Sequence, residues 1–161
     1  MATKRENLSK KPAVKVLVMR RLIEAPRDAV WKAWTDRDQM QRWWGPEGFT
    51  NPVCEMNVRP GGAIRIDMRA PDGTVNPMTG NFHEIAEPER LVFTSKAFEN
   101  EEGDAELEVF NTVRFVEREG KTELDLRAVV VKATPKMKAA LAGMKEGWSQ
   151  SLVRLANLVK S

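Results

Sequence analysis

The chain has 161 residues, of which 42% are hydrophobic and 30% are charged, and this composition is typical of a single soluble globular domain. Its 26 Lys and Arg residues and 23 Asp and Glu residues give a net charge of only +3, too small an excess to favour a nucleic-acid partner. There is one Cys, and no apolar run reaches the roughly 18 residues of a membrane-spanning helix. We therefore expect a cytoplasmic protein without disulfides or membrane insertion.

The N-terminal part of the chain divides into a tail, a strand and two short helices. Residues 1–13 are polar and basic and lack periodicity, which predicts a disordered tail in front of one domain, residues 14–161. The segment Lys15–Ala25 is rich in Val, Leu and Ile, as β-strands are. Two short helices are predicted to follow, over Ala29–Trp34 and from a cap at Thr35 or Asp36 to Trp43-Trp44.

The middle of the chain, residues 53–131, has the alternation of antiparallel strands. Apolar residues recur there at every second position, which predicts strands that each bury one face. Gly80 interrupts one of these strands and is predicted to mark a β-bulge. The six predicted strands are Val53–Val58, 64–69, Val75–Ile85, Leu91–Ala97, Leu107–Val116 and Thr122–Val131.

The C-terminal segment predicts one long helix. Thr134 suits the N-cap, and Pro135 suits the first helical position. A helix of about 26 residues would be about 39 Å long, and its apolar stripe needs a broad apolar partner, which the predicted sheet offers. The stripe consists of Met137, Leu141, Met144, Trp148, Leu152, Leu155 and Val159.

Together these elements predict an α+β fold. A curved antiparallel sheet of about seven strands would wrap on the long C-terminal helix, in the order β-α-α-β6-α. An apolar sheet face has to be covered, and the terminal helix is the only predicted element long enough to cover it. If the sheet curls around this helix, a space remains between them, and the two short helices close one end of that space.

Short motifs accompany this order of elements. They are Ala25-Pro26 with Val30–Thr35, then Trp43–Pro46, Arg59–Gly62, Gly80–Ile85 with Pro88–Thr94, and Gly143 with Gly147-Trp148. In this order they resemble the START-like superfamily (SRPBCC, helix-grip fold), and within it the family related to the C-terminal domain of the Hsp90 ATPase activator. The resemblance implies a helix-grip domain over nearly the whole chain. It implies no single function, because the superfamily includes lipid carriers, hormone receptors, polyketide cyclases and antibiotic-binding proteins.

Residues predicted to face the interior are candidates for lining a cavity, with packing in the core as the alternative for each. Aromatic and Met side chains suit such walls because they offer large or adaptable apolar area. Asn111 shares a predicted buried face with two Val residues, so it is a buried polar candidate. The predicted ligand-binding residues are Trp43 or Trp44, Met56, Ile66, Phe82, Glu84, Phe93, Asn111, Met144 and Trp148.

Among these, Glu84 is the polar group expected to matter most. It shares one strand face with Phe82, so an inward Phe82 would bring Glu84 inward as well, to bind a ligand or transfer a proton. The alternative is a surface carboxylate or one paired with Arg. The sequence pattern contains no catalytic triad, and its single His cannot anchor an ordinary zinc site. We therefore predict no catalytic set, no metal and no cofactor.

We expect the protein to bind a hydrophobic small molecule (a lipid, a polyketide or an aromatic metabolite) as a monomer or a weak homodimer. A cyclase- or hydrolase-type enzyme using the same cavity is the second interpretation, and it would need an inward acid such as Glu84. An Hsp90-type chaperone-interacting module is the third. The eukaryotic activator has a separate N-terminal domain with much of the chaperone contact. Only a short tail precedes the first predicted strand here, which favours the other two interpretations.

Overall fold

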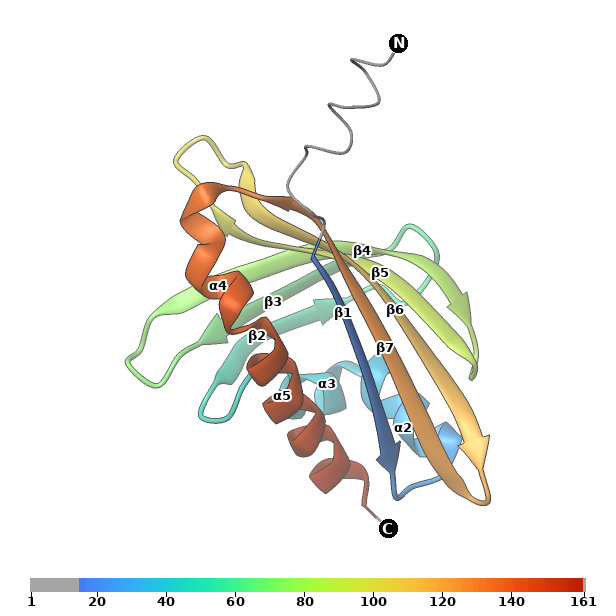
Figure 1. The fold of residues 1–161 in the computed structure, drawn as a ribbon. Helices are drawn as coiled ribbons and strands as arrows, with labels where there is room; N and C mark the ends of the chain where they lie inside the picture. Colours follow the sequence, from blue (N-terminus) through green and yellow to red (C-terminus); the bar gives the residue numbers. More distant parts are fainter. Residues whose placement is uncertain (1–14, 161) are drawn as a thin grey trace, which may run out of the picture.

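A curved antiparallel sheet is the main element of the fold (Figure 1). Residues 15–160, which the computed structural model describes, form seven strands in the spatial order β1-β7-β6-β5-β4-β3-β2. The predicted tail, residues 1–13, lies outside the described residues. The strands are β1 Val16–Ile23, β2 Thr50–Met56, β3 Ala63–Arg69, β4 Val75–Ala86, β5 Arg90–Glu99, β6 Ala105–Arg118 and β7 Lys121–Ala133.

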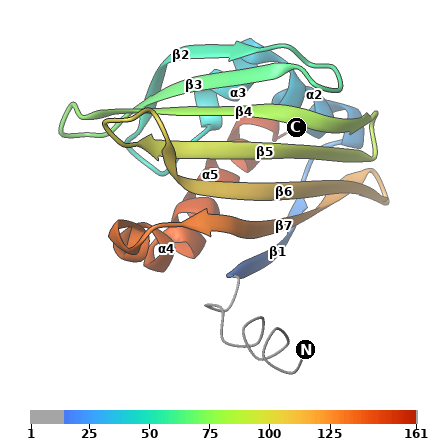
Figure 2. The ribbon, with the colours of Figure 1, turned by 90° about the horizontal axis from the view of Figure 1, so that it is seen from above.

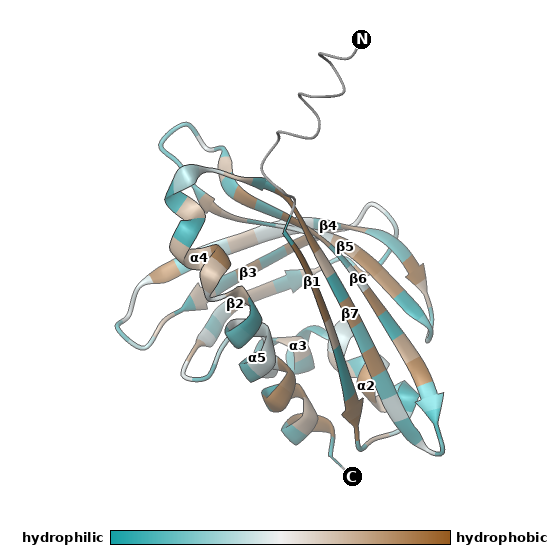
Figure 3. Ribbon diagram, in the orientation of Figure 1, coloured by the Kyte–Doolittle hydropathy of each residue, from teal (hydrophilic) through white to brown (hydrophobic). Residues whose placement is uncertain are grey.

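The sheet has one apolar and one polar face, as the alternation predicts. Hydrophobic and hydrophilic residues alternate along its strands in Figure 3. On β7, for example, Leu126 and Ala128 are buried while Arg127 between them is exposed. The α+β helix-grip architecture predicted from the sequence is thereby confirmed.

Two short helices cover one end of the apolar face. They are α2, Arg27–Thr35, and α3, Arg37–Trp43, and Figure 2 shows them on the same side of the sheet as the C-terminal helix. Asp36 lies between them, and its carboxylate accepts a hydrogen bond from the Asp38 backbone N–H at the start of α3. Trp34 and Trp43 are fully buried with ring centroids 4.6 Å apart, so the aromatic content of these helices forms part of the core.

The prediction of one continuous terminal helix is wrong in one respect. The segment consists of a 3-10 turn, Pro135–Met137, then α4, Lys138–Ala142, and α5, Met144–Val159. Gly143 separates α4 from α5 with φ −88° and ψ −1°. Glycine has a low helix propensity, and the apolar stripe does not reveal such a break because Gly143 lies outside it.

The prediction that Gly80 marks a bulge is also wrong. Gly80 pairs regularly with Ser95, and the register of β4 against β5 shifts between Phe82 and Glu84 instead. A Cβ atom at Gly80 would lie 1.8 Å from the Thr94 carbonyl oxygen, so glycine is needed there for the close approach of β5. The glycine in the strand thus marks a packing contact, and the extra residue of the bulge, His83, lies three residues later.

Candidate functional site

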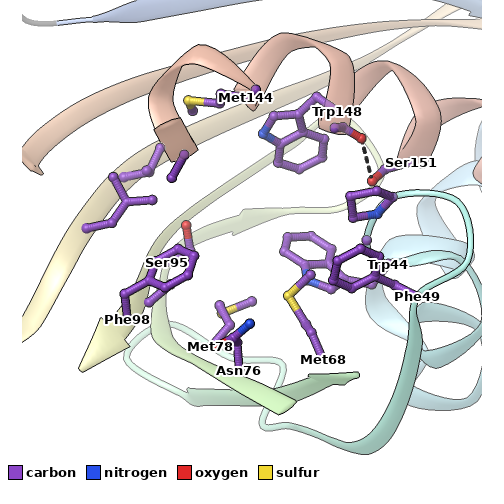
Figure 4. A pocket seen from close by; sticks show the side chains of 18 of the residues that line it. Trp44, Phe49, Met68, Asn76, Met78, Ser95, Phe98, Met144, Trp148 and Ser151 are labelled. Atoms are coloured by element: carbon purple, nitrogen blue, oxygen red, sulfur yellow. Dashed lines mark hydrogen bonds between the residues drawn. The ribbon is translucent and has the colours of Figure 1, made fainter. Parts of the chain in front are cut away.

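A cavity of about 400 Å³ lies between the sheet and the C-terminal helices (Figure 4). One wall is the loop after α3, from Trp44 to Phe49, and a second is formed by inward residues of β3 to β6. The third wall is formed by α4 and by the first half of α5. Pro77, Ala139 and Gly143 line the cavity and are also exposed, so it opens to solvent at this end.

Small residues on the helix side leave this volume open. The residues of α4, of α5 and of the junction between them that line the cavity are Ala139, Ala140, Gly143, Met144, Gly147, Trp148 and Ser151. Further along α5 the inward positions are Leu152 and Leu155, which are buried in the core. The change from Ala and Gly in α4 and the start of α5 to Leu further along α5 therefore explains why the cavity lies at one end of the concave face and a packed core at the other.

Aromatic rings form the inner part of the cavity. Trp44 and Trp148 meet edge to face, with ring centroids 5.4 Å apart and an angle of 85° between the ring planes. Trp34 stacks behind Trp148 at 6.1 Å and 18°. Trp148 itself is only half-buried, because its other side faces the cavity. These rings offer large apolar area to a ligand.

Three polar side chains, Asn76, Ser95 and Asn111, interrupt the apolar sheet wall, and Ser95 and Asn111 lie together on the neighbouring strands β5 and β6. Asn111 is 0% exposed, and its amide nitrogen donates to the carbonyl oxygens of Phe93 and Val109, both at 3.3 Å, and to the Ser95 hydroxyl oxygen at 3.1 Å. The Asn111 side-chain oxygen finds no hydrogen-bond partner among the described residues. A buried acceptor in this state is an unmet requirement that a ligand or water can meet.

Arg154 fixes the loop wall to α5. Its guanidinium donates to the carbonyl oxygens of Trp44 at 3.2 Å, Gly45 at 2.8 Å and Pro46 at 3.0 Å, and a further bond reaches Arg42 at 2.9 Å. Burial lowers the pKa of Arg154. The sequence pattern does not single out this residue, because the C-terminal segment has the pattern of an amphipathic helix on which Arg154 is one more charged position.

Four of the predicted ligand-binding residues come together at the cavity: Trp44, Asn111, Met144 and Trp148. The other apolar candidates lie deeper. Trp43 is fully buried, and its ring N–H donates to the Ala33 carbonyl oxygen at 2.8 Å. Met56, Ile66, Phe82 and Phe93 surround a separate void of about 10 Å³, too small for anything larger than a water molecule.

Glu84 is not inside the cavity, so the expectation of an inward carboxylate is wrong. The register shift after Phe82 ends the alternation on which that expectation depended, and both His83 and Glu84 are exposed. The Glu84 carboxylate lies 3.2 Å from the Arg90 guanidinium, and its side chain is 48% exposed. Glu84 therefore matches the alternative prediction from the sequence, a surface carboxylate paired with Arg.

The chemistry available in the cavity is binding and orientation. Of the described residues that line it, none has a titratable side chain. Cys54 is buried elsewhere in the core, and burial raises its pKa to about 11, so its thiol stays protonated at neutral pH. Within residues 15–160 no cluster of three or more His, Cys, Asp or Glu side chains could hold a metal, and no helix is long and apolar enough to cross a membrane.

The fold and the cavity define a class of protein, the helix-grip proteins, in which a curved sheet holds a C-terminal helix across its apolar face. The model of the family described as activator of Hsp90 ATPase homolog 1-like protein matches residues 24–160. The chain therefore belongs to this family, as the sequence motifs indicate. Membership supports a ligand-binding or Hsp90-ATPase-activator-like module.

Solved structures agree with the fold. A protein from Chromobacterium violaceum is 24% identical, with a TM-score of 0.79 over 91% of this chain and 98% of that one. One from Nitrosomonas europaea is 23% identical, with a TM-score of 0.77 over 90% and 94% of the two chains. An AHSA1-like protein from Aeromonas hydrophila is 24% identical, with a TM-score of 0.71 over 91% and 92%. At these identities the likeness shows the fold alone. No curated protein matches the chain in a sequence comparison.

Proposed function

We propose that this protein binds a small, mainly apolar molecule in the cavity between the sheet and α4–α5. The observation that supports this most strongly is the cavity itself. Its volume of about 400 Å³ falls in the range of about 300–1,000 Å³ that small-molecule sites occupy, and its walls are mostly aromatic and aliphatic. A lipid chain, a polyketide or an aromatic metabolite matches this chemistry. One chain supplies every wall, so a monomer is sufficient, and the single Cys54 suits a cytoplasmic location.

The walls can adapt to a ligand. Met68 and Met78 line the space from the sheet, and Met144 lines it from α5 (Figure 4). Thioether side chains have several rotatable bonds and fill irregular space at little energetic cost. The aromatic pair Trp44 and Trp148 supplies the rigid part of the site.

A titration with N-phenyl-1-naphthylamine, an uncharged apolar fluorescent probe, tests the proposal. The native protein should bind the probe with saturation. Met144→Trp places a larger ring in the cavity and should abolish this binding without unfolding the chain. Val153→Trp is the matched control, because Val153 lies on the same helix but is 57% exposed and does not line the cavity.

Two outcomes would overturn the proposal. One is probe binding that appears only when urea partly unfolds the protein. The other is destabilisation by Met144→Trp of about 1–3 kcal/mol relative to Val153→Trp, as overpacking of a closed core would cause.

An Hsp90-ATPase-activator-like function is the second candidate, and family membership supports it. The decisive comparison is the ATPase rate of an Hsp90 chaperone with the native protein and with Met144→Trp. Equal acceleration by both would assign the function to the outer surface and leave the cavity without a role in it. Our proposal expects no acceleration by either. The cyclase or hydrolase interpretation depended on an inward Glu84 and has lost that support.

A further inference from the structure

The described residues that line the cavity include polar side chains but no charged ones. A carboxylate, phosphate or ammonium group that entered this space would lose its hydration and find no counter-ion, which opposes binding strongly. The cavity therefore favours molecules that carry no charge on the part that is enclosed.

Asn111 presents an acceptor whose orientation is fixed. Its amide nitrogen contacts the carbonyl oxygens of Phe93 and Val109, and carbonyl oxygens only accept hydrogen bonds. The opposite orientation of the amide would place two acceptors against each other, so the nitrogen lies toward these carbonyls. The side-chain oxygen is then the free end, and it has no partner among the described residues although Asn111 is fully buried.

Ser95 supplies a donor beside this acceptor. Its oxygen accepts the bond from the Asn111 amide at 3.1 Å, so its own O–H remains available to donate. Figure 4 shows the Ser95 hydroxyl directed toward the space beneath Met144 and Trp148. β5 and β6 are paired so that Ser95 is opposite Val109 and Asn111 is opposite Phe93, which brings donor and acceptor to one spot on the sheet wall.

We propose that the ligand is an uncharged molecule with a mainly apolar body and one hydroxyl or amide group, and that this group hydrogen-bonds to the Ser95 hydroxyl and to the Asn111 side-chain oxygen. A hydroxyl accepts from Ser95 and donates to Asn111 at the same time. A hydrocarbon does neither, and a carboxylate has no proton to donate. The inference rests on the proposed function, because it specifies the ligand chemistry of the same cavity.

The test uses three compounds of one shape: naphthalene, 2-naphthol and 2-naphthoate, which at pH 7 are apolar, hydroxylated and anionic. The affinity of each compound is measured by its ability to displace N-phenyl-1-naphthylamine from the full-length protein. The expected order of affinity is 2-naphthol, then naphthalene, then 2-naphthoate. Ser95→Ala should lower the affinity for 2-naphthol about fivefold, which corresponds to about 1 kcal/mol for one hydrogen bond at 1.4 kcal/mol per tenfold. The affinity for naphthalene should not change.

Asn111→Leu removes the acceptor and keeps a side chain of similar volume. It should also lower the affinity for 2-naphthol and leave that for naphthalene unchanged. Ser149→Ala is the control, because Ser149 lies on α5 outside the cavity and contacts Arg21. If Asn111→Leu fails to fold in a urea titration, Ser95→Ala alone decides the result, since it removes one oxygen atom from a half-buried position.

The possible results separate the two proposals. Unchanged 2-naphthol affinity in folded Ser95→Ala, or 2-naphthoate binding as tight as that of 2-naphthol, overturns this inference. The proposed function stands even when this inference is overturned in one of these ways, provided that naphthalene binds to the native protein and not to Met144→Trp. If the probe binds the native protein with saturation but none of the three compounds displaces it, this inference fails and the proposed function stands. If the probe itself does not bind the native protein with saturation, both fail.

Discussion

At the scale of single residues, Arg154 joins the cavity loop to the helix opposite. Its hydrogen bonds reach backbone carbonyls that are 108 to 112 positions away in the sequence. Gln150 adds a second tie, because its side-chain oxygen accepts from the Glu47 backbone N–H at 3.0 Å. The loop that carries Trp44 is therefore positioned by α5 and not by its own sequence alone.

Arg154→Ala should loosen this wall. Four carbonyl oxygens lose their charged donor, so we expect the free energy of unfolding to fall by about 1–3 kcal/mol. Probe affinity should fall as well, because Trp44 loses its fixed position. Urea titrations and probe titrations of the same variant measure both effects.

The control for this change is Arg127→Ala, since Arg127 is an exposed residue of β7 on the polar face of the sheet. It should alter stability by no more than about 0.5 kcal/mol. If Arg154→Ala behaves like Arg127→Ala, the loop holds its position without the guanidinium and the assigned role is wrong.

The residue scale is also where the sequence was least informative. The predicted strand parity placed Asn111 correctly, because β6 pairs regularly with β7 from Val109 onward and the register shift between these strands lies before it, between Glu108 and Val109. The prediction from strand parity failed at Glu84, because one extra residue in β4 between Phe82 and Glu84 changes which face the following side chains point to. Arg154 was beyond prediction, since its partners are backbone oxygens that only the folded chain brings close.

At the scale of elements, two glycines have opposite roles. Gly143 has a backbone conformation open to any residue, and a Cβ atom there would lie 3.6 Å from the Ala139 carbonyl oxygen, an ordinary contact. Gly80 has no such room, because a Cβ atom would overlap the Thr94 carbonyl oxygen at 1.8 Å. The first glycine separates two helices, and the second allows two strands to pair.

The matched pair Gly80→Ala and Gly143→Ala therefore should differ in sign. Gly143→Ala should raise the free energy of unfolding by about 0.5–1 kcal/mol, because alanine restricts the unfolded chain and favours helix. Gly80→Ala should lower it by about 3 kcal/mol, because β4 and β5 have to separate. Urea denaturation followed by circular dichroism measures both. Equal effects would show that the close approach of β5 at Gly80 is not required for stability.

At the scale of the whole molecule, the order and type of the elements were predictable. The period-two alternation in the strands and the stripe from Met137 to Val159 set the sheet face and the helix that covers it. The position of the cavity could not be predicted, because it depends on which helix positions carry small residues toward the sheet. In retrospect the run Ala139, Ala140, Gly143 and Gly147 is the sequence signal for that open volume.

The central claim is that an uncharged apolar molecule occupies this cavity. The most direct measurement follows the ring N–H signals of the five Trp residues by ¹⁵N NMR during a titration with N-phenyl-1-naphthylamine. If the molecule binds there, the shifts should be saturable, largest for Trp44 and Trp148, which line the cavity, and smallest for Trp31 and Trp43, which do not. Saturable binding that leaves Trp44 and Trp148 unshifted, or that moves Trp31 and Trp43 most, would contradict the central claim.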